Sequence, residues 1–229
     1  MTARFEVAAV LCDLDGTLVD SAPDLAVAVD ATLQDLDMTP RGEAAVRNWV
    51  GNGAERLLHR ALTNDDHGEA DPDLLARAKE RFWEHYHQNL CVHSRLYPEV
   101  AEGLRELARR GYRLGCVTNK PAAFTHPLLA GLGVAEFFPV VLGGDSVPNK
   151  KPAPDMLLEA ATQLGVSIQQ TLLVGDSITD VRTARNAGCP VVCVPYGYNH
   201  GQPIHDAGAD AVIDALTALP ELLQRAATP

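Results

Sequence analysis

An acidic pair near the start of the sequence has the composition of a catalytic centre. Asp13 and Asp15 flank Leu14 at the end of an apolar run and are followed by Gly16. Alternate strand residues point to opposite faces, but beyond the strand end the chain can turn so that both carboxylates reach one pocket. One carboxylate can then attack phosphorus while the other, protonated, supplies a proton to the leaving alkoxide. Taken alone, the motif also fits a pair of solvated acids or a calcium loop.

A second acidic pair has the spacing of a metal site. Asp176 and Asp180 lie four residues apart, after an apolar run and a glycine turn. If Ser177 caps the helix that follows, the two carboxylates approach one pocket from the turn and from the first helical face. Mg²⁺ takes hard oxygen ligands from one or two carboxylates, and water and a phosphate complete its octahedron. The alternative is that both aspartates only stabilise the start of the helix.

Two loops carry side chains that suit a phosphate group. Thr118 and Asn119 follow an apolar run, where a hydroxyl and loop amides can hold phosphate oxygens. Lys150 and Lys151 precede two prolines, which stiffen their loop. Each loop has a plain alternative, a helix cap for the first and a solvated basic turn for the second. Three of the four lysines of the chain, Lys120 among them, nevertheless lie in these two loops, so the positive charges can converge at one site.

These motifs must be positioned by alternating strands and helices. The apolar runs predict strands over residues 7–14, 113–118, 140–142, 171–174, 191–194 and 211–213. Helical periodicity predicts helices over residues 99–110, 121–132, 155–164 and 178–187, each followed by a terminating glycine. The alternation predicts an α/β fold with a Rossmann-like, doubly wound parallel sheet. Ligands bind such sheets at the carboxyl ends of the strands, which is where the four motifs fall.

The segment from residue 20 to residue 95 breaks this alternation. Its apolar residues have helical spacing, it contains no convincing strand, and turns are expected at Thr39-Pro40, at Gly51-Asn52-Gly53 and near Asp71-Pro72. We therefore expect a helical cap over residues 20–95, inserted into a catalytic core made of residues 1–19 and 96–229.

Charge and composition exclude several kinds of partner. A formal net charge of −11 and a pI near 5.1 argue against nucleic acid, whose binding needs clustered lysine and arginine. No apolar run has membrane-spanning length, no secretory leader is visible, and the five cysteines include no CxxC pair. The eight histidines lack ligand spacing. We expect a cytoplasmic protein with buried reduced thiols and a small phosphorylated metabolite as its partner. The sequence does not set the oligomeric state.

The four motifs, in this order on separate strand ends, resemble the haloacid dehalogenase superfamily of phosphohydrolases over the whole chain. The resemblance implies a Rossmann-like core with an inserted α-helical cap of the C1 type. It implies that Asp13 is the nucleophile and a metal ligand. It also implies that Asp15 is the general acid, later the base, and that its backbone carbonyl binds Mg²⁺.

The same resemblance implies roles for the other motifs. Thr118 and the Asn119 amide would bind the transferring phosphoryl group, and Lys151 would balance the charge between nucleophile and phosphate. Asp176 would bind Mg²⁺ directly, and Asp180 would be a ligand or support one. These roles agree with the chemistry, because an anionic nucleophile approaches a phosphate dianion only if positive charge neutralises the pair.

Residues 13–24 and 49–54 resemble a narrower subgroup, the bacterial phosphoglycolate phosphatases. This implies hydrolysis of 2-phosphoglycolate to glycolate and phosphate. It also implies that Gly51, Asn52 and Gly53 form a specificity loop over the site, with Arg56 nearby as a carboxylate clamp. Arg56 is equally consistent with a solvated helix residue.

Several alternatives compete with this interpretation. A phosphatase for N-acetylmuramic acid 6-phosphate or for a broad range of sugar phosphates shares the same chemistry. A dehalogenase has no need of Asp15, a phosphonatase needs a cap lysine for which only Lys79 is available, and mutases carry basic residues where this chain has Val50 and Ala54. A phosphorylated receiver module, the main reading without enzymatic activity, has no use for a cap. An inactive binding protein would not need every acid and base of the set.

Overall fold

A parallel sheet lies at the centre of the protein in the computed structural model, which describes residues 5–226. Its six strands are Ala9–Cys12 (β2), Arg113–Val117 (β5), Val140–Leu142 (β6), Thr171–Gly175 (β7), Val191–Cys193 (β8) and Ala211–Val212 (β9). Their spatial order is β6-β5-β2-β7-β8-β9. After β6 the chain crosses to the other side of β2, so the topological switch point lies at β2. The predicted doubly wound α/β fold is confirmed.

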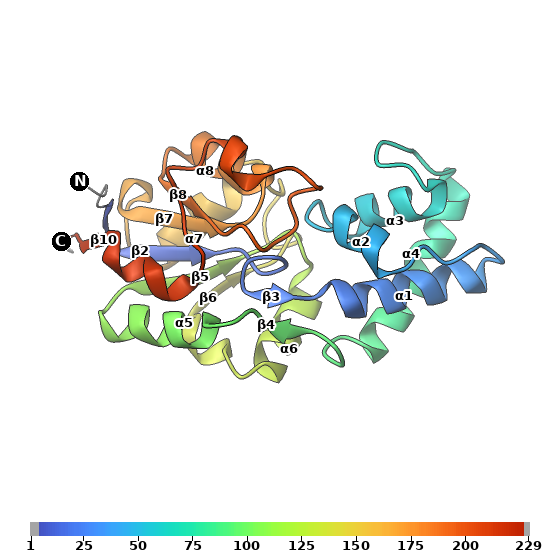
Figure 1. Cartoon of the computed structure of the whole chain (residues 1–229), viewed down its shortest axis with the longest axis horizontal. Coiled ribbons are helices and arrows are strands. Elements are labelled where there is room, and N and C mark those ends of the chain that lie inside the picture. The colour runs from blue at the N-terminus through green and yellow to red at the C-terminus, as the bar shows by residue number, and fades with distance from the viewer. Residues whose placement is uncertain (1–4, 227–229) are drawn as a thin grey trace.

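Helices cover both faces of this sheet. Val100–Arg109 (α5) and Ala122–Gly131 (α6) pack on one face together with the 3₁₀ helix Leu216–Glu221 (η4), whereas Asp155–Gln163 (α7) and Ile178–Ala187 (α8) pack on the other. Figure 1 shows these two layers. The predicted terminators at 111, 133, 165 and 188 all have positive φ, between 65° and 83°, as expected for the residue that ends a helix.

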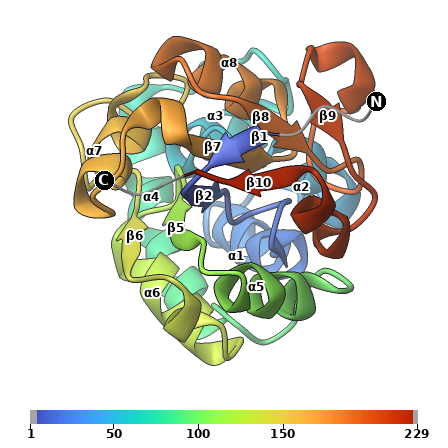
Figure 2. The same ribbon diagram turned by 90° about the vertical axis from the view of Figure 1, so that its left-hand side faces the viewer.

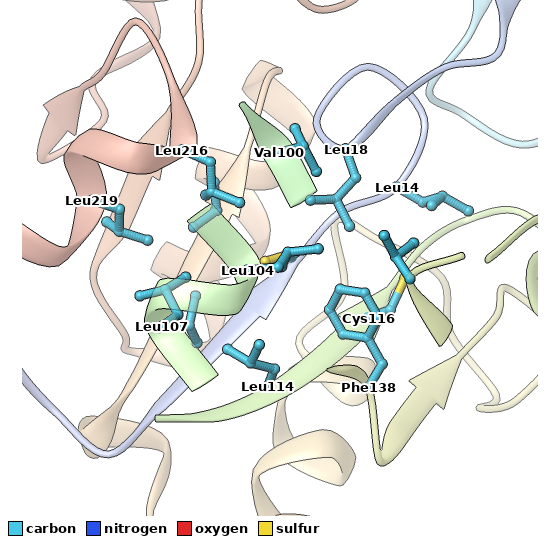
Figure 3. Packing of buried hydrophobic residues seen from close by; sticks show 14 of the residues in the cluster. Leu14, Leu18, Val100, Leu104, Leu107, Leu114, Cys116, Phe138, Leu216 and Leu219 are labelled. Carbon is cyan, nitrogen blue, oxygen red and sulfur yellow. The ribbon is translucent and has the colours of Figure 1, made fainter. Parts of the chain in front are cut away.

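The strands divide their side chains between two hydrophobic cores. In β2, Val10 and Cys12 face the core under α5, whereas Ala9 and Leu11 face the core under α7. This is the two-residue period of a strand whose two faces are both buried. Figure 3 shows part of the first core, in which Leu104 of α5 is among the labelled side chains. Each buried leucine stabilises the fold by roughly 1.5–3 kcal/mol.

Four helices stand apart from the sheet, beyond the carboxyl ends of its strands (Figure 1). They are Ala22–Asp35 (α1), Glu43–Trp49 (α2), Ala54–Thr63 (α3) and Pro72–Gln88 (α4). They enclose a hydrophobic cluster of their own, centred on residues such as Val29, Leu58 and Phe82. We propose that residues 20–95 form the cap and that the remainder forms the core. Residues 1–4 and 227–229, which the prediction placed at the ends of the core, lie outside the described residues.

Short strands account for the differences from the predicted elements. The run over 7–14 was expected to form one strand, but Phe5–Val7 (β1) pairs instead with Leu223–Arg225 (β10) in a separate parallel ribbon (Figure 2). A second ribbon, antiparallel, joins Val19–Asp20 (β3) to Arg95–Leu96 (β4), where the cap helices leave and rejoin the core. Both ribbons pair segments that are far apart in the sequence, so no local pattern marks them.

The remaining features concern membranes and cysteines. None of the helices in residues 5–226 combines the length and the apolar character that a bilayer-spanning segment requires. All five cysteines are free thiols, and four of them are buried. Desolvation raises the pKa of buried Cys12 to about 12, so this thiol is protonated and unreactive at neutral pH.

Candidate active site

Three buried aspartates meet at the carboxyl ends of the central strands. Asp13 follows β2, Asp176 follows β7, and Asp180 lies in the first turn of α8. One carboxylate oxygen from each lies within 4.8 Å of the others. Asp13 is fixed because its backbone N–H donates to the Val174 carbonyl at 2.9 Å, which continues the strand pairing beyond the end of β2. The first and fourth predicted motifs therefore lie together.

Hydrogen bonds orient the two aspartates of the fourth motif. The Thr17 hydroxyl donates to Oδ1 of Asp176 at 2.8 Å, and the Tyr198 N–H donates to its Oδ2 at 2.5 Å. Oδ2 of Asp180 accepts from the Ser177 hydroxyl at 2.7 Å and from the Ser177 N–H at 3.2 Å, in the capping box that begins α8. Ser177 is the predicted helix cap, and the capping box leaves Oδ1 of Asp180 directed toward the site.

The backbone encloses Asp176 closely. A Cβ atom on Gly16 would lie 2.2 Å from Oδ2 of Asp176, and one on Gly197 would lie 2.3 Å from the same atom. Gly16 also has φ of +94°, a conformation that side chains disfavour. The glycine after the first acidic pair is therefore required by its contact with the second pair.

One lysine neutralises part of this cluster. Lys151 is 5% exposed, and its Nζ lies 2.7 Å from Oδ1 of Asp13 and 2.8 Å from Oδ1 of Asp180. The Asn119 side chain fixes the lysine loop: its Oδ1 accepts from the Lys151 N–H at 3.0 Å, and its Nδ2 donates to the Lys151 carbonyl at 3.2 Å. The same Nδ2 donates to the Gly51 carbonyl at 3.2 Å. The sequence predicted a role only for the Asn119 amide, and the structure adds this positioning role of the side chain.

Burial and like charge make the cluster a strong candidate for binding a cation. Desolvation raises the pKa of Asp13 to about 7; Lys151 opposes the shift and Asp180 adds to it. Desolvation, then Asp180 and Asp13, raise the pKa of Asp176 well above its usual value. Burial lowers the pKa of Lys151, but Asp13 and Asp180 outweigh burial, so this lysine stays cationic. One ammonium among three carboxylates leaves the buried cluster short of positive charge.

The donors in this cluster fit a hard divalent cation. All three are carboxylates, which magnesium and calcium prefer, and they converge from separate elements on one point. The cluster that the described residues form here contains no sulfur or imidazole donor, which softer metals favour. Asp15, the remaining predicted metal residue, was expected to contribute its backbone carbonyl.

A small cavity of about 40 Å³ opens beside this cluster. Asp13, Asp15, Thr118 and Asn119 line it on the core side. Oδ1 of Asp15 accepts from the Ser21 hydroxyl at 2.5 Å. The predicted nucleophile, general acid and phosphate-binding loop thus share one cavity.

Lys120 also lines this cavity and was not among the predicted site residues. Its Nζ lies 3.0 and 3.1 Å from the two carboxylate oxygens of Asp15. Burial lowers the pKa of Lys120, but Asp15 and Tyr86 outweigh burial, so the pKa lies above its usual value. The position of Lys120 directly after Thr118 and Asn119 was the sequence feature that could have indicated its place in the site. The expected convergence of lysines holds for Lys120 and Lys151.

The predicted specificity loop closes the cavity from the cap side. Gly51 and Gly53 line the cavity and have φ of +117° and +86°, so glycine is favoured at both positions. Asn52, between them, points instead to the core, where its Nδ2 donates to the Thr179 hydroxyl at 3.3 Å. All three residues of the turn thus lie at the junction of α2 and α3 with the core.

Arg56 does not reach the cavity. Its guanidinium donates to the Gly68 carbonyl at 3.1 Å, to Oε1 of Glu69 at 2.5 Å and to the Asp66 carbonyl at 2.7 Å. These partners lie in the loop between α3 and α4, and Arg56 is not among the residues that line the cavity. The contacts of the Arg56 guanidinium therefore lie within the cap and not at the cavity.

Fold and site together define an α/β protein in which a buried carboxylate cluster suited to a divalent cation lies beside a small cavity at the carboxyl ends of the strands. The chain belongs to the haloacid dehalogenase-like hydrolases, because the model of that family matches residues 7–188. It is therefore a hydrolase, and the resemblance inferred from its motifs is confirmed.

Relatives of known name cover almost the whole chain. The phosphoglycolate phosphatase of Nitrosococcus oceani is 49% identical over 218 residues, which cover 95% of this chain and 97% of that protein. The phosphoglycolate phosphatase of Nitrosospira multiformis is 44% identical over 219 residues, 96% of each chain. A crystal structure of a predicted phosphoglycolate phosphatase from Haemophilus somnus 129PT superimposes with a TM-score of 0.88 at 38% identity and covers 94% of this chain and 97% of that one.

Proposed function

We propose that this hydrolase is a Mg²⁺-dependent phosphatase that converts 2-phosphoglycolate to glycolate and phosphate through an aspartyl-phosphate on Asp13. The observation that carries this proposal is the contact of Lys151 with Asp13 at 2.7 Å, at the edge of a cavity that Asp15 also lines. This arrangement supplies a nucleophile, a neutralising charge and a proton donor within one small volume. The names of its relatives support the substrate.

In the first half-reaction a carboxylate oxygen of Asp13 forms a bond to phosphorus. The bond between phosphorus and the ester oxygen breaks, and Asp15 donates a proton to that oxygen, so that glycolate leaves. Lys151 offsets the repulsion between the carboxylate and the phosphate. The Thr118 hydroxyl and the Asn119 N–H hold the phosphoryl oxygens in line for the attack.

In the second half-reaction water replaces Asp13 on phosphorus. Asp15, now a carboxylate, accepts a proton from the attacking water as the new bond forms. The bond between phosphorus and the Asp13 oxygen then breaks, which releases phosphate and restores the carboxylate. One residue thus acts first as acid and then as base.

The proposed Mg²⁺ ligands are Asp13, Asp176, the Asp15 carbonyl and, directly or through a water, Asp180. When bound, Mg²⁺ supplies positive charge that offsets the charge of the transferring phosphoryl group. The convergence of the three buried carboxylates supports this choice. The hard oxygen donors favour Mg²⁺ over softer metals.

The closeness of the cap to the core supports a small leaving group. The cap turn Gly51–Gly53 and the side chains of α4 bound the cavity on the outer side. A phosphatase for N-acetylmuramic acid 6-phosphate or for sugar phosphates would need the cap to stand further from the core.

Phosphate release by the wild type and Asp13→Asn, with Mg²⁺ or with EDTA, tests the proposal. The substrates are 2-phosphoglycolate, N-acetylmuramic acid 6-phosphate, pyrophosphate and a panel of sugar phosphates. We expect a preference of about 100-fold in kcat/KM for 2-phosphoglycolate, lost in EDTA and in the variant. Similar kcat/KM values across the panel would contradict 2-phosphoglycolate as the substrate. Phosphate release that persists in EDTA or in Asp13→Asn would contradict the proposed mechanism.

We also propose a cytoplasmic location and a small phosphorylated metabolite as the partner. Five free cysteines fit a reducing compartment, which supports the expected cytoplasmic location. The formal charge of −11 supports a small phosphorylated metabolite, and not a nucleic acid, as the partner.

A further inference from the structure

The cavity contains a buried cation whose function the proposed reaction does not explain. Lys120 is 6% exposed and is the only basic side chain among the described residues that line the cavity. Lys151 already neutralises the nucleophile from the other side. Lys120 lies instead against Asp15, the residue that protonates the leaving oxygen. Its charge is therefore placed beside the proposed proton donor and not beside the proposed nucleophile.

Lys120 has donor capacity to spare. Its Nζ carries three N–H donors, and the two oxygens of Asp15, at 3.0 and 3.1 Å, engage at most two of them. The ammonium also lies 4.8 Å from the centre of the Tyr86 ring, so an aromatic face holds it on one side. The third donor can therefore turn to the Tyr86 hydroxyl beside it or to a ligand in the cavity.

The hydroxyl of Tyr86 is the second unexplained polar group. Tyr86 is 1% exposed and lines the cavity, and none of the described residues gives its hydroxyl a hydrogen bond of ordinary length, although the Lys120 ammonium lies near enough to interact with it. A buried hydroxyl without a partner is unfavourable by roughly 1–3 kcal/mol, so such groups are normally paired. The cavity that Tyr86 shares with Lys120 offers space in which a ligand atom can satisfy it.

The surroundings favour an anion over a neutral group. Leu25, Leu57, Phe82 and Trp83 form the cap wall of the cavity. An apolar wall lowers the local dielectric, which strengthens the attraction between an ammonium and a carboxylate. In 2-phosphoglycolate a single carbon separates the carboxylate from the ester oxygen, so a carboxylate lies close to Asp15 whenever the phosphate is in place.

We propose that Lys120 and Tyr86 form the subsite that binds the carboxylate of the leaving group and thereby select an anionic leaving group over a neutral one. One carboxylate oxygen accepts from the Lys120 ammonium, and the other accepts from the Tyr86 hydroxyl. Lys120 keeps its contact with Asp15 and so aligns the carboxylate with the proton donor. This inference rests on the proposed function, and it gives these residues the carboxylate-binding role that the sequence predicted for Arg56.

A pair of substrates of equal length tests the proposal. 2-Phosphoglycolate carries a carboxylate where 2-hydroxyethyl phosphate carries a neutral hydroxymethyl group. The measurement is the ratio of kcat/KM for the two substrates at saturating Mg²⁺. Any indirect damage to Asp15 or to the phosphate site lowers both values together and cancels in the ratio.

The variants are Lys120→Met and Tyr86→Phe, with Lys79→Met as the control for loss of one lysine charge. Lys79 is an exposed cap residue paired with Glu55. We expect Lys120→Met to lower the ratio about 10- to 100-fold and Tyr86→Phe about 3- to 10-fold, the ranges for a charged and a neutral hydrogen bond. The ratio for Lys79→Met should stay within about twofold of the wild type.

Two failures can be told apart. A wild type without preference for 2-phosphoglycolate would overturn the proposed substrate and this subsite with it. A wild type that prefers it, with an unchanged ratio in both variants, would overturn the subsite alone. Tyr86→Phe keeps the ring and removes one oxygen, so it decides the question even if Lys120→Met does not fold.

Discussion

The ammonium of Lys151 lies 2.7 Å from Oδ1 of Asp13 and bridges this aspartate to Asp180 at 2.8 Å. One buried cation therefore contacts both the proposed nucleophile and a proposed metal residue. Its loop is in turn fixed by Asn119. This relationship links catalysis to stability, because removing a charge from the cluster changes both.

Lys151→Met should abolish most activity and destabilise the protein. Removing one partner of a buried ion pair leaves uncompensated charge and destabilises by about 3–5 kcal/mol. We expect that loss in metal-free protein at pH 8 and a smaller loss at pH 5, where Asp13, with a pKa of about 7, is protonated. Urea unfolding at both pH values measures it. Lys150→Met, at an exposed neighbouring position, should change stability by less than about 0.5 kcal/mol. Equal losses in the two variants would contradict the prediction.

Asp13→Asn should abolish phosphate release and stabilise the metal-free protein above neutral pH. The pKa of Asp13 is raised to about 7 in the folded protein, so the folded state holds a proton that the unfolded chain has lost. The protonated Asp13 side chain contributes fully to the stability of the folded state below about pH 4. This contribution is lost as the pH rises to about 7, so the wild type becomes less stable over that range. We expect the free energy of unfolding of the variant to exceed that of the wild type by roughly 4 kcal/mol at pH 8 in EDTA.

Urea unfolding in EDTA at pH 5 and pH 8 tests this difference, and Mg²⁺ provides the control. A cation that binds only the folded state at 100 times its dissociation constant stabilises it by about 2.7 kcal/mol. The wild type should gain this stabilisation, whereas Asp13→Asn, with one ligand fewer, should gain less. A variant less stable than the wild type at pH 8 in EDTA would show that Asp13 is held mainly by its ion pair.

Local patterns in the sequence were enough to predict most of the fold. Buried parallel strands are short apolar runs, and the glycines that end α5, α6, α7 and α8 mark the helix boundaries directly. The ribbons β1–β10 and β3–β4 were missed because each joins segments far apart in the chain. The missed strands β3, β4 and β10 mix apolar and polar residues over two or three positions, whereas the equally short β6, β8 and β9 were found because they are wholly apolar.

The core half of the site was also predictable, but the cap half was not. Motifs at the carboxyl ends of parallel strands must meet, since the sheet topology brings those ends together. The direction of a side chain on a cap helix depends instead on how the cap packs against the core. Arg56 therefore pairs with Glu69, whereas Tyr86, an ordinary aromatic residue in the sequence, lines the cavity.

Gly16→Ala should weaken metal binding strongly. The new Cβ would lie 2.2 Å from Oδ2 of Asp176, at a position with φ of +94°. Relief of this overlap displaces the Asp176 carboxylate, so we expect the Mg²⁺ dissociation constant to rise about 10- to 100-fold. Titration of activity with Mg²⁺ measures the change. Gly188→Ala is a suitable control, because this helix-ending glycine has similar φ and nothing within 4 Å, so an equal rise there would point to strain alone.

Arg56→Ala should leave the reaction nearly unchanged. The guanidinium binds the 66–69 loop of the cap, away from the cavity. We expect kcat/KM for 2-phosphoglycolate to stay within about threefold of the wild type and stability to fall by about 1 kcal/mol, as the carbonyls lose their donor. Steady-state kinetics and thermal unfolding measure the two effects. A rise in KM of about 100-fold with kcat retained would restore Arg56 to the site.

Asn119→Ala should lower both stability and kcat, because one amide side chain fixes the lysine loop and the cap turn. Its Oδ1 accepts from the Lys151 N–H at 3.0 Å, and its Nδ2 donates to the carbonyls of Lys151 and Gly51, both at 3.2 Å. A buried N–H left without its acceptor is unfavourable by about 1–3 kcal/mol, and urea unfolding should show a loss of this size. Release of the loop also shifts Lys151 from Asp13, so kcat should fall about 10- to 100-fold.

Asn119→Asp separates the two functions of this side chain. The carboxylate keeps an acceptor for the Lys151 N–H but loses the donor to the carbonyls of Lys151 and Gly51, so the lysine loop keeps one of its two contacts while the link to Gly51 is broken. We expect this variant to retain more kcat than Asn119→Ala and to show a higher KM, because the cap turn closes less firmly over the substrate. If both variants lose kcat equally with KM unchanged, then the contact with Gly51 has no part in holding the substrate, and the Asn119 side chain acts only through Lys151.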